Sequence, residues 1–167
     1  VGLGFFVYAN WLQLKAELAQ VLIEQAWEET QQMPDQQHKP WNWADFWPVA
    51  KLQAADNDPV YVLSGSNGQA LAFGPGHMSE STVPGDQGQV IIAGHKDSHF
   101  AFLQTSQLGD ILQLEDSLGI NRKYTISNTE IVDSSKQTLR MDNKDELLLI
   151  TCYPFNSLQM NGPLRLV

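Results

Sequence analysis

The sequence has little of three things: cysteine, basic residues and long apolar runs. With one cysteine in 167 residues the chain has no intrachain disulfide. Ten lysines and arginines stand against 19 acidic residues, so the net charge is −9. That balance argues against nucleic-acid partners and against electrostatic docking to anionic lipid, because both need positive charge on the protein. No apolar run reaches the roughly 20 residues that a membrane-spanning helix requires.

What is present is the composition of an ordinary globular domain, with 43% apolar and 17% charged residues. From Pro48 onward, short apolar stretches alternate with glycine-rich turns, and no further helical pattern follows. This predicts an all-β fold, a closed or nearly closed barrel with short helical turns between strands. Within it, residues 60–63 and 69–73 are expected to pair as a hairpin around the Asn-Gly signal in residues 65–68.

The first 40 residues have a different character. Apolar residues recur at spacings of three and four over residues 11–32, which predicts a helix. Its expected packing face consists of Leu12, Leu14, Leu18, Val21, Leu22, Ala26 and Trp27. Prolines then end the helix. We therefore expect a helical segment and linker over residues 1–40 and a barrel domain over residues 41–167. The apolar residues 1–9 fit either the trimmed end of an upstream membrane segment or the start of a buried helix.

Three tryptophans within residues 41–47 are interpreted as a seal over one end of the core, in preference to a stacking site for a sugar or a base.

The only cysteine lies at the end of a predicted buried strand, residues 147–150. A lone cysteine is more often an inert apolar residue than a nucleophile. However, His95 follows another predicted buried strand, residues 89–93, and Arg165 follows a short loop. A nucleophilic thiol needs a base or a cation nearby, and acyl transfer needs a donor for the developing oxyanion. Spacing alone does not bring Cys152, His95 and Arg165 together, so three unrelated residues remain an alternative.

The segments around these residues resemble the motifs of the sortase family. Residues 90–100, Val-Ile-Ile-Ala-Gly-His-Lys-Asp-Ser-His-Phe, resemble the histidine motif. Residues 149–152, Leu-Ile-Thr-Cys, resemble the second half of a Thr-Leu-x-Thr-Cys motif, and residues 162–165, Gly-Pro-Leu-Arg, resemble the closing arginine segment. The resemblance covers about residues 47–167 and is closest to the single-domain sortases of Gram-negative proteobacteria.

Three positions depart from the family pattern. Leu148 stands where threonine is common, a change expected to alter the substrate groove. Gln89 stands where asparagine is frequent, and Lys96 where arginine often follows the histidine. The last two are expected to be tolerable changes on the surface.

The resemblance implies an eight-stranded barrel and a cysteine transpeptidase. By it, Cys152 attacks the Thr–Gly carbonyl of a Leu-Pro-x-Thr-Gly-like signal near the C-terminus of a substrate protein, and the thioacyl intermediate passes to an amine acceptor. His95 would serve as acid and base, and Arg165 as oxyanion donor. The residues expected to line the substrate site are Thr151, Leu149 and His77.

The same resemblance implies a monomer that needs no cofactor or metal. It also implies an anchor upstream of Val1 in the inner membrane, with the catalytic domain on the extracytoplasmic side.

Several alternatives remain. Water in place of an amine would make the protein a cysteine peptidase, and an inert Cys152 would leave a β-barrel binding module. His95 and His99 have the i, i+4 spacing of a helical metal site, but the zincin glutamate is missing and the segment leaves a strand. Asp97 is expected to cap a helical turn at residues 100–103; its alternative role is to orient His95. The scattered acidic residues have no calcium-loop spacing.

Overall fold

The structure is a computed structural model of the 167-residue chain. It describes residues 2–55, 57–138, 144–157 and 162–167, with side chains at Trp11 and from Leu14 onward. The elements in chain order are α1 (Gly2–Gln32), β1 (Pro48–Ala54), β2 (Val60–Ser64), α2 (Gly68–Phe73), β3 (Gly76–His77), β4 (Gln89–Ala93), η1 (Ala101–Gln104), β5 (Ile111–Asp116), β6 (Asn121–Thr125), β7 (Ile131–Asp133), β8 (Glu146–Cys152) and β9 (Leu164–Leu166).

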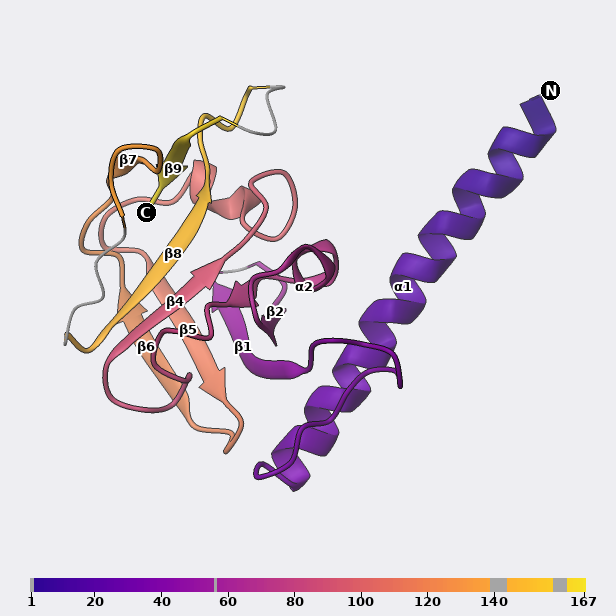
Figure 1. Ribbon diagram of the computed structural model, residues 1–167, viewed down its shortest axis with the longest axis horizontal. Helices are drawn as coiled ribbons and strands as arrows, with labels where there is room; N and C mark the ends of the chain where they lie inside the picture. The colour runs from indigo at the N-terminus through magenta and orange to yellow at the C-terminus, as the bar shows by residue number, and fades with distance from the viewer. Residues whose placement is uncertain (1, 56, 139–143, 158–161) are drawn as a thin grey trace.

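The strands form one curled sheet in the order β6-β5-β1-β2-β3-β4-β8-β9-β7 (Figure 1). The pairs β2/β3 and β4/β8 are parallel, and the other neighbouring pairs are antiparallel. The all-β class with an N-terminal helix is thus confirmed, and the closed barrel of eight strands is an approximation to this curled sheet of nine.

The sheet is open between its two ends. Within the described ranges, β6 and β7 terminate the strand order and no pairing joins them. A cavity of about 500 Å³ lies inside this opening, with Tyr124 and Thr125 of β6 on one wall and residues 147–149 of β8 on another.

The central pair, β4 and β8, explains two continuous apolar runs in the sequence. Residues 89–92 of β4 are all buried, and β8 pairs with β4 from Gln89 opposite Glu146 to Ala93 opposite Ile150. A strand that is covered on both faces carries an unbroken apolar run, as β4 does. β8 is apolar over residues 147–150 but only partly buried, with Leu149 and Thr151 as its buried residues. Val90, Ile92 and Leu149 belong to the main core cluster.

The predicted hairpin after β2 is wrong. Residues 68–73 form the helix α2, and the next strand, β3, pairs with β2 in parallel. The side chain of Asn67 accepts hydrogen bonds from the backbone N–H groups of Gln69 and Ala70, at 3.1 and 2.9 Å. Asparagine is as good an N-cap as it is a turn residue, so the Asn-Gly pair begins a helix here.

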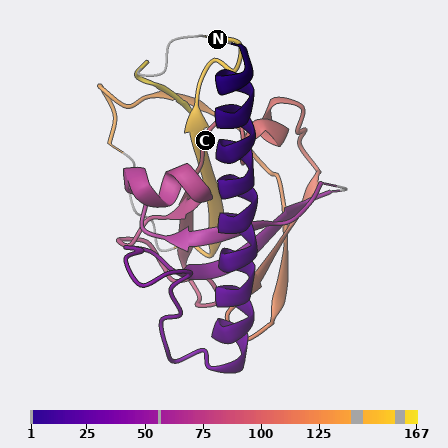
Figure 2. The same cartoon turned by 90° about the vertical axis from the view of Figure 1, so that its right-hand side faces the viewer.

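The helix α1 packs on the sheet with only part of the expected face. Figure 1 shows its C-terminal half beside β1 and β2 and its N-terminal end away from the sheet, and Figure 2 shows the helix in front of the sheet. The expected packing residues Leu14, Leu18 and Val21 are 57%, 56% and 48% exposed. The buried side chains include the expected Ala26 and Trp27 but form a neighbouring face of the helix; they are Ala19, Ile23, Ala26, Trp27 and Thr30. No helix in the described part of the chain combines the length and apolarity needed to cross a membrane.

The aromatic segment before β1 joins α1 to the sheet. Phe46 is fully buried, in a second core cluster that includes Ile23 and Leu63. Trp41 packs edge-on against Phe46, with ring centroids 5.5 Å apart. The structural interpretation is therefore confirmed for Trp41, whereas Trp43 is 80% exposed and seals nothing in this structure. The division at residue 40 falls in the loop between α1 and β1 and stays a prediction.

Candidate active site

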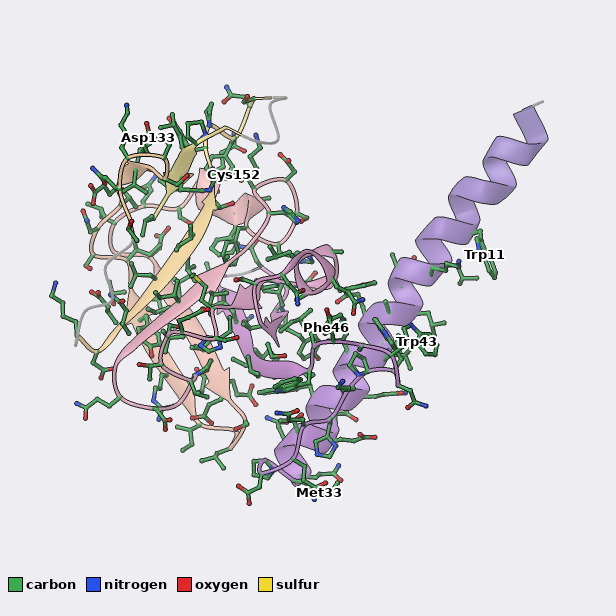
Figure 3. All side chains as sticks on the ribbon, viewed as in Figure 1. Trp11, Met33, Trp43, Phe46, Asp133 and Cys152 are labelled. Carbon is green, nitrogen blue, oxygen red and sulfur yellow. The ribbon has the colours of Figure 1, made fainter. Side chains whose placement is uncertain are left out.

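The pairing of β4 with β8 brings His95 and Cys152 to one edge of the sheet. Ala93 lies opposite Ile150, and the Gly94 N–H donates to the Ile150 carbonyl at 3.0 Å. His95 and Cys152 follow this last pair by the same number of residues. Because the strands are parallel, their carboxyl ends lie at the same edge. Figure 3 shows Cys152 at the end of β8, beside β9. Cys152 is partly buried and His95 is exposed.

Arg165 lies directly across from Cys152. β8 and β9 are antiparallel, and Cys152 is the register partner of Arg165. Directly opposite residues in such a ladder have their side chains on the same face, with Cβ atoms about 5 Å apart. The Arg165 Nη1 donates to the carbonyls of Gly162 and Leu164, at 2.6 and 2.8 Å. These two bonds orient the planar guanidinium.

Thr151 connects the two strand ends. Its side chain is buried, and Oγ1 donates to the Gly94 carbonyl at 2.8 Å. Thr151 was expected to line the substrate site, but the structure uses its hydroxyl to hold β8 against the residue before His95. Contact with a substrate stays a prediction for Thr151.

Gly94 is required by the loop that carries His95. The loop turns back on itself, and the Phe100 N–H donates to the His95 carbonyl at 3.0 Å. The fully buried Phe100 ring then lies against Gly94: a Cβ there would approach the ring atoms Cδ2, Cγ and Cε2 to 2.7, 2.8 and 3.0 Å. Only glycine leaves room for this ring.

We expect Gly94→Ala to lower the free energy of unfolding by about 1–3 kcal/mol, because the added methyl overpacks a full core. Equilibrium urea unfolding measures the change. Gly68→Ala is the matched control, since a Cβ at Gly68 meets nothing within 4 Å. A Gly94→Ala variant as stable as Gly68→Ala would show that the Phe100 ring can move aside.

The predicted cap by Asp97 is wrong. The short helix η1 begins at Ala101, its N-cap position is Phe100, and no side chain caps it. Backbone bonds form the turn instead, with the Ala101 N–H donating to the Ser98 carbonyl at 3.1 Å. The exposed Asp97 side chain precedes the first turn by too many residues to act as its N-cap.

His99 lies close enough to His95 for the two imidazoles to interact electrostatically. Burial lowers the pKa of His99, and the nearby charge of protonated His95 lowers it further. His99 is therefore a partly buried, neutral neighbour of the candidate base. Among the described residues, no group of three or more histidine, cysteine, aspartate or glutamate side chains is arranged to hold a metal ion.

His77 is buried at the end of β3, where the loop to β4 begins. Its Nε2 donates to the Thr82 carbonyl at 2.9 Å, and the Ser81 hydroxyl lies 3.0 Å from the same nitrogen. Burial lowers the pKa of His77, against smaller opposing effects from the Thr82 carbonyl and the charge of Glu80. The structure thus gives His77 a role in holding its loop, while the expected substrate contact is untested.

Leu149 is also placed in the interior. It is 8% exposed, belongs to the main core cluster and lines the cavity between β6 and β8. That cavity borders β8 at residues 147–149, and Cys152 is not among the residues that line it. Leu148 lines the same cavity, so its predicted effect on the substrate groove is likewise untested.

The two departures expected on the surface are both buried. Gln89 is 5% exposed and donates to the Glu146 carboxylate at 2.7 Å. Lys96 is 6% exposed, and its Nζ donates to the carbonyls of Pro154 and Ser157. The sequence prediction missed Lys96, since a lysine in a polar loop normally points to solvent.

Comparisons with known proteins identify relatives of this chain. A family model described as the Sortase domain matches residues 52–167. Sortase D of Bacillus subtilis (strain 168) is 34% identical over 113 residues, which are 66% of this chain and 56% of that protein. The chain therefore spans a little over half the length of this curated relative.

Solved structures share the fold. A Sortase D5 transpeptidase from Clostridium perfringens has a TM-score of 0.64 at 20% identity, covering 83% of each chain. Sortase A from Corynebacterium diphtheriae has a TM-score of 0.63 at 23% identity, covering 74% of this chain and 60% of that one. At these identities the likeness concerns the fold alone.

The expected affinity to Gram-negative sortases is not supported, because the relative matched in sequence comes from the Gram-positive Bacillus subtilis. The family itself is shown by the match of its model to most of the chain, on a fold shared with solved sortases. This chain belongs to the sortase family.

Proposed function

We propose that this protein is a cysteine transpeptidase that cleaves a Leu-Pro-x-Thr-Gly-like signal in a substrate protein and transfers the protein to an amine. The observation that carries the proposal is the meeting of three segments at one sheet edge. His95 and Cys152 follow paired parallel strands, and Arg165 is the cross-strand partner of Cys152. This arrangement offers a nucleophile, an acid/base and an oxyanion donor without a cofactor.

The first half of the reaction forms the thioester. The Cys152 thiolate adds through Sγ to the Thr–Gly carbonyl carbon, and the carbonyl oxygen becomes an oxyanion that accepts hydrogen bonds from Arg165. When the intermediate collapses, the C–N bond breaks. The leaving glycine amine takes its proton from the His95 imidazolium, and the acyl group stays on sulfur.

The second half reverses these roles. The incoming amine loses a proton to His95 and attacks the thioester carbonyl, again with the oxyanion facing Arg165. Collapse forms the new amide bond and expels the Cys152 thiolate. Water in place of the amine would give a carboxylic acid and make the protein a peptidase.

Product masses separate these two outcomes. A peptide that contains the Leu-Pro-x-Thr-Gly-like signal is incubated with the protein and an excess of glycine peptides. The main product is expected to be the N-terminal fragment joined to the glycine peptide, with the free acid in the minority. Cys152→Ala serves as the blank. Accumulation of the acid alone, at saturating amine, would establish the peptidase instead.

Arg165→Lys tests the oxyanion donor. Lysine keeps the charge but lacks the planar fork whose Nη1 is held by the Gly162 and Leu164 carbonyls. We expect kcat for peptide cleavage to fall about tenfold or more, the effect of losing one well-placed bond to a charged group. Lys136→Arg is a control at an exposed cation. If Arg165→Lys turns over at the wild-type rate, Arg165 is only a surface charge.

We further propose that a membrane segment preceding Val1 tethers the domain to the cytoplasmic membrane, with the active site on the extracytoplasmic side. Support comes from α1, whose N-terminal end stands away from the sheet (Figure 1). It exposes Trp11, Leu14 and Leu18 there, which are 53–57% accessible. Fractionation of cells expressing the full-length protein tests this location.

A further inference from the structure

Lys96 is a buried cation that the proposed reaction does not use. It directly follows His95 and is 6% exposed. Its Nζ donates to the Pro154 carbonyl at 2.8 Å and to the Ser157 carbonyl at 2.6 Å. An ammonium is strongly disfavoured away from water unless its donors are satisfied. These two carbonyls therefore determine where the side chain, and the backbone next to His95, can lie.

The two bonds join the loop of the base to the loop of the nucleophile. Pro154 and Ser157 belong to the segment that leaves β8 after Cys152. On the other side of the site, the Thr151 hydroxyl and the Ile150 carbonyl hold Gly94, the residue before His95. Two connections therefore flank His95 and Cys152. One joins Gly94 to the residues before Cys152, and the other joins Lys96 to the residues after Cys152.

This connection matters because the strand ladder stops short of the base. The β4–β8 pairing ends at Ala93 and Ile150, so His95 lies in a loop with an exposed side chain. His95 exchanges a proton with the amine that leaves or attacks the acyl group on Cys152, so its imidazole must lie within hydrogen-bond distance of that amine. A displacement of about 1 Å at such a site can cost about a hundredfold in rate. A loop anchor one residue from the base is well placed to prevent it.

We propose that Lys96 is a positioning residue, which sets the distance between His95 and Cys152 by tying the two loops together. The proposal rests on the proposed function, because it presupposes that His95 acts on Cys152. Lys96 itself touches neither the substrate nor the reacting atoms in this scheme.

The test is a double-mutant cycle on thiol alkylation, which needs no knowledge of the substrate. The rate of Cys152 with iodoacetamide is measured in the wild type, His95→Ala, Lys96→Met and the double variant. Methionine keeps an apolar stem and removes all donors. Lys96→Met is expected to slow alkylation about as much as His95→Ala, and the double variant no further, because both changes remove one interaction.

Peptide cleavage supplies the second readout. Lys96→Met is expected to lower kcat about tenfold or more while KM changes by less than about twofold, since the substrate surface is not altered. Lys96→Arg can still donate to two carbonyls and should recover kcat to within about threefold of the wild type.

Lys51→Met is the matched control. Lys51 Nζ lies 2.6 Å from the Glu115 carboxylate, on the β1–β5 ladder away from the site. Lys51→Met removes one lysine ammonium, as Lys96→Met does, but at a distance from the site. The alkylation rate of Cys152 and kcat should therefore stay at wild-type values. Thermal unfolding of every variant identifies the temperature range in which all are folded.

Three results decide the matter. If His95→Ala does not slow alkylation in the wild-type background, the proposed pairing of His95 with Cys152 is wrong and both proposals fall. If His95→Ala slows alkylation but folded Lys96→Met reacts like the wild type, only the role of Lys96 is overturned. Should Lys96→Met not fold, the same criteria apply to Lys96→Gln, whose shorter side chain cannot span both carbonyls as the lysine does.

Discussion

Cys152→Ala is expected to abolish cleavage of a Leu-Pro-x-Thr-Gly-type peptide and to leave the fold intact. The variant lacks the sulfur that forms the acyl intermediate, so cleavage should fall below about a thousandth of the wild-type rate, as for other enzymes that lose their nucleophile. The fold should persist because β8 is held by backbone pairing with β4 and β9, to which the thiol contributes nothing. Alanine also fits the space of a partly buried thiol.

Chromatographic assay of the two peptide fragments measures this loss, and circular dichroism with thermal unfolding checks the fold. Retention of a tenth of the wild-type rate by a folded Cys152→Ala would remove Cys152 from the nucleophile role. Another residue of the protein would then have to carry out the cleavage.

His95→Ala is the second large effect. Without an acid the glycine amine is a poor leaving group, so acylation should slow by about a hundredfold or more. Single-turnover measurement of the released C-terminal fragment reports acylation directly. His95 is exposed, so its truncation should change the free energy of unfolding little.

His99→Ala is the matched control for this experiment. His99 is the neighbouring imidazole, and it interacts electrostatically with His95. Its removal should change acylation by less than about threefold. A change in substrate affinity alone in His95→Ala, with the acylation rate unaffected, would make His95 a groove residue and leave the reaction without its acid.

The sequence predicts the centre of the fold better than its periphery. The apolar run of β4 is unbroken because this strand is covered on both faces, so its burial could be predicted without a structure. The apolar run of β8 led to the same prediction, but only Leu149 within that run is buried. The pairing between the two strands could not be predicted, since nothing local specifies which strands become neighbours. The resemblance to sortases implied that Cys152 and His95 meet, and the pairing of β4 with β8 brings them to one edge of the sheet.

The errors have identifiable physical causes. Asn67 is equally suited to a turn and to a helix N-cap. In the structure its side chain accepts hydrogen bonds from the Gln69 and Ala70 N–H groups, and the helix α2 begins there. Leu14 and Leu18 have helical spacing, but α1 packs through the neighbouring face that contains Ala19 and Ile23, so both leucines stay exposed. Lys96 is buried by carbonyls more than fifty residues away in sequence, and no local pattern marks such a partner.

The central claim is that Cys152 carries the acyl group, and mass spectrometry of the acylated protein and its peptides tests it most directly. The protein is mixed with a Leu-Pro-x-Thr-Gly-type peptide without an amine acceptor, quenched in acid within the first turnover, and digested. The account predicts an adduct with the mass of the N-terminal peptide fragment, confined to the segment containing Cys152, absent from Cys152→Ala, and discharged by added amine. Cleaved peptide with an unmodified Cys152 at every time point, or an acyl group on another residue, would contradict it.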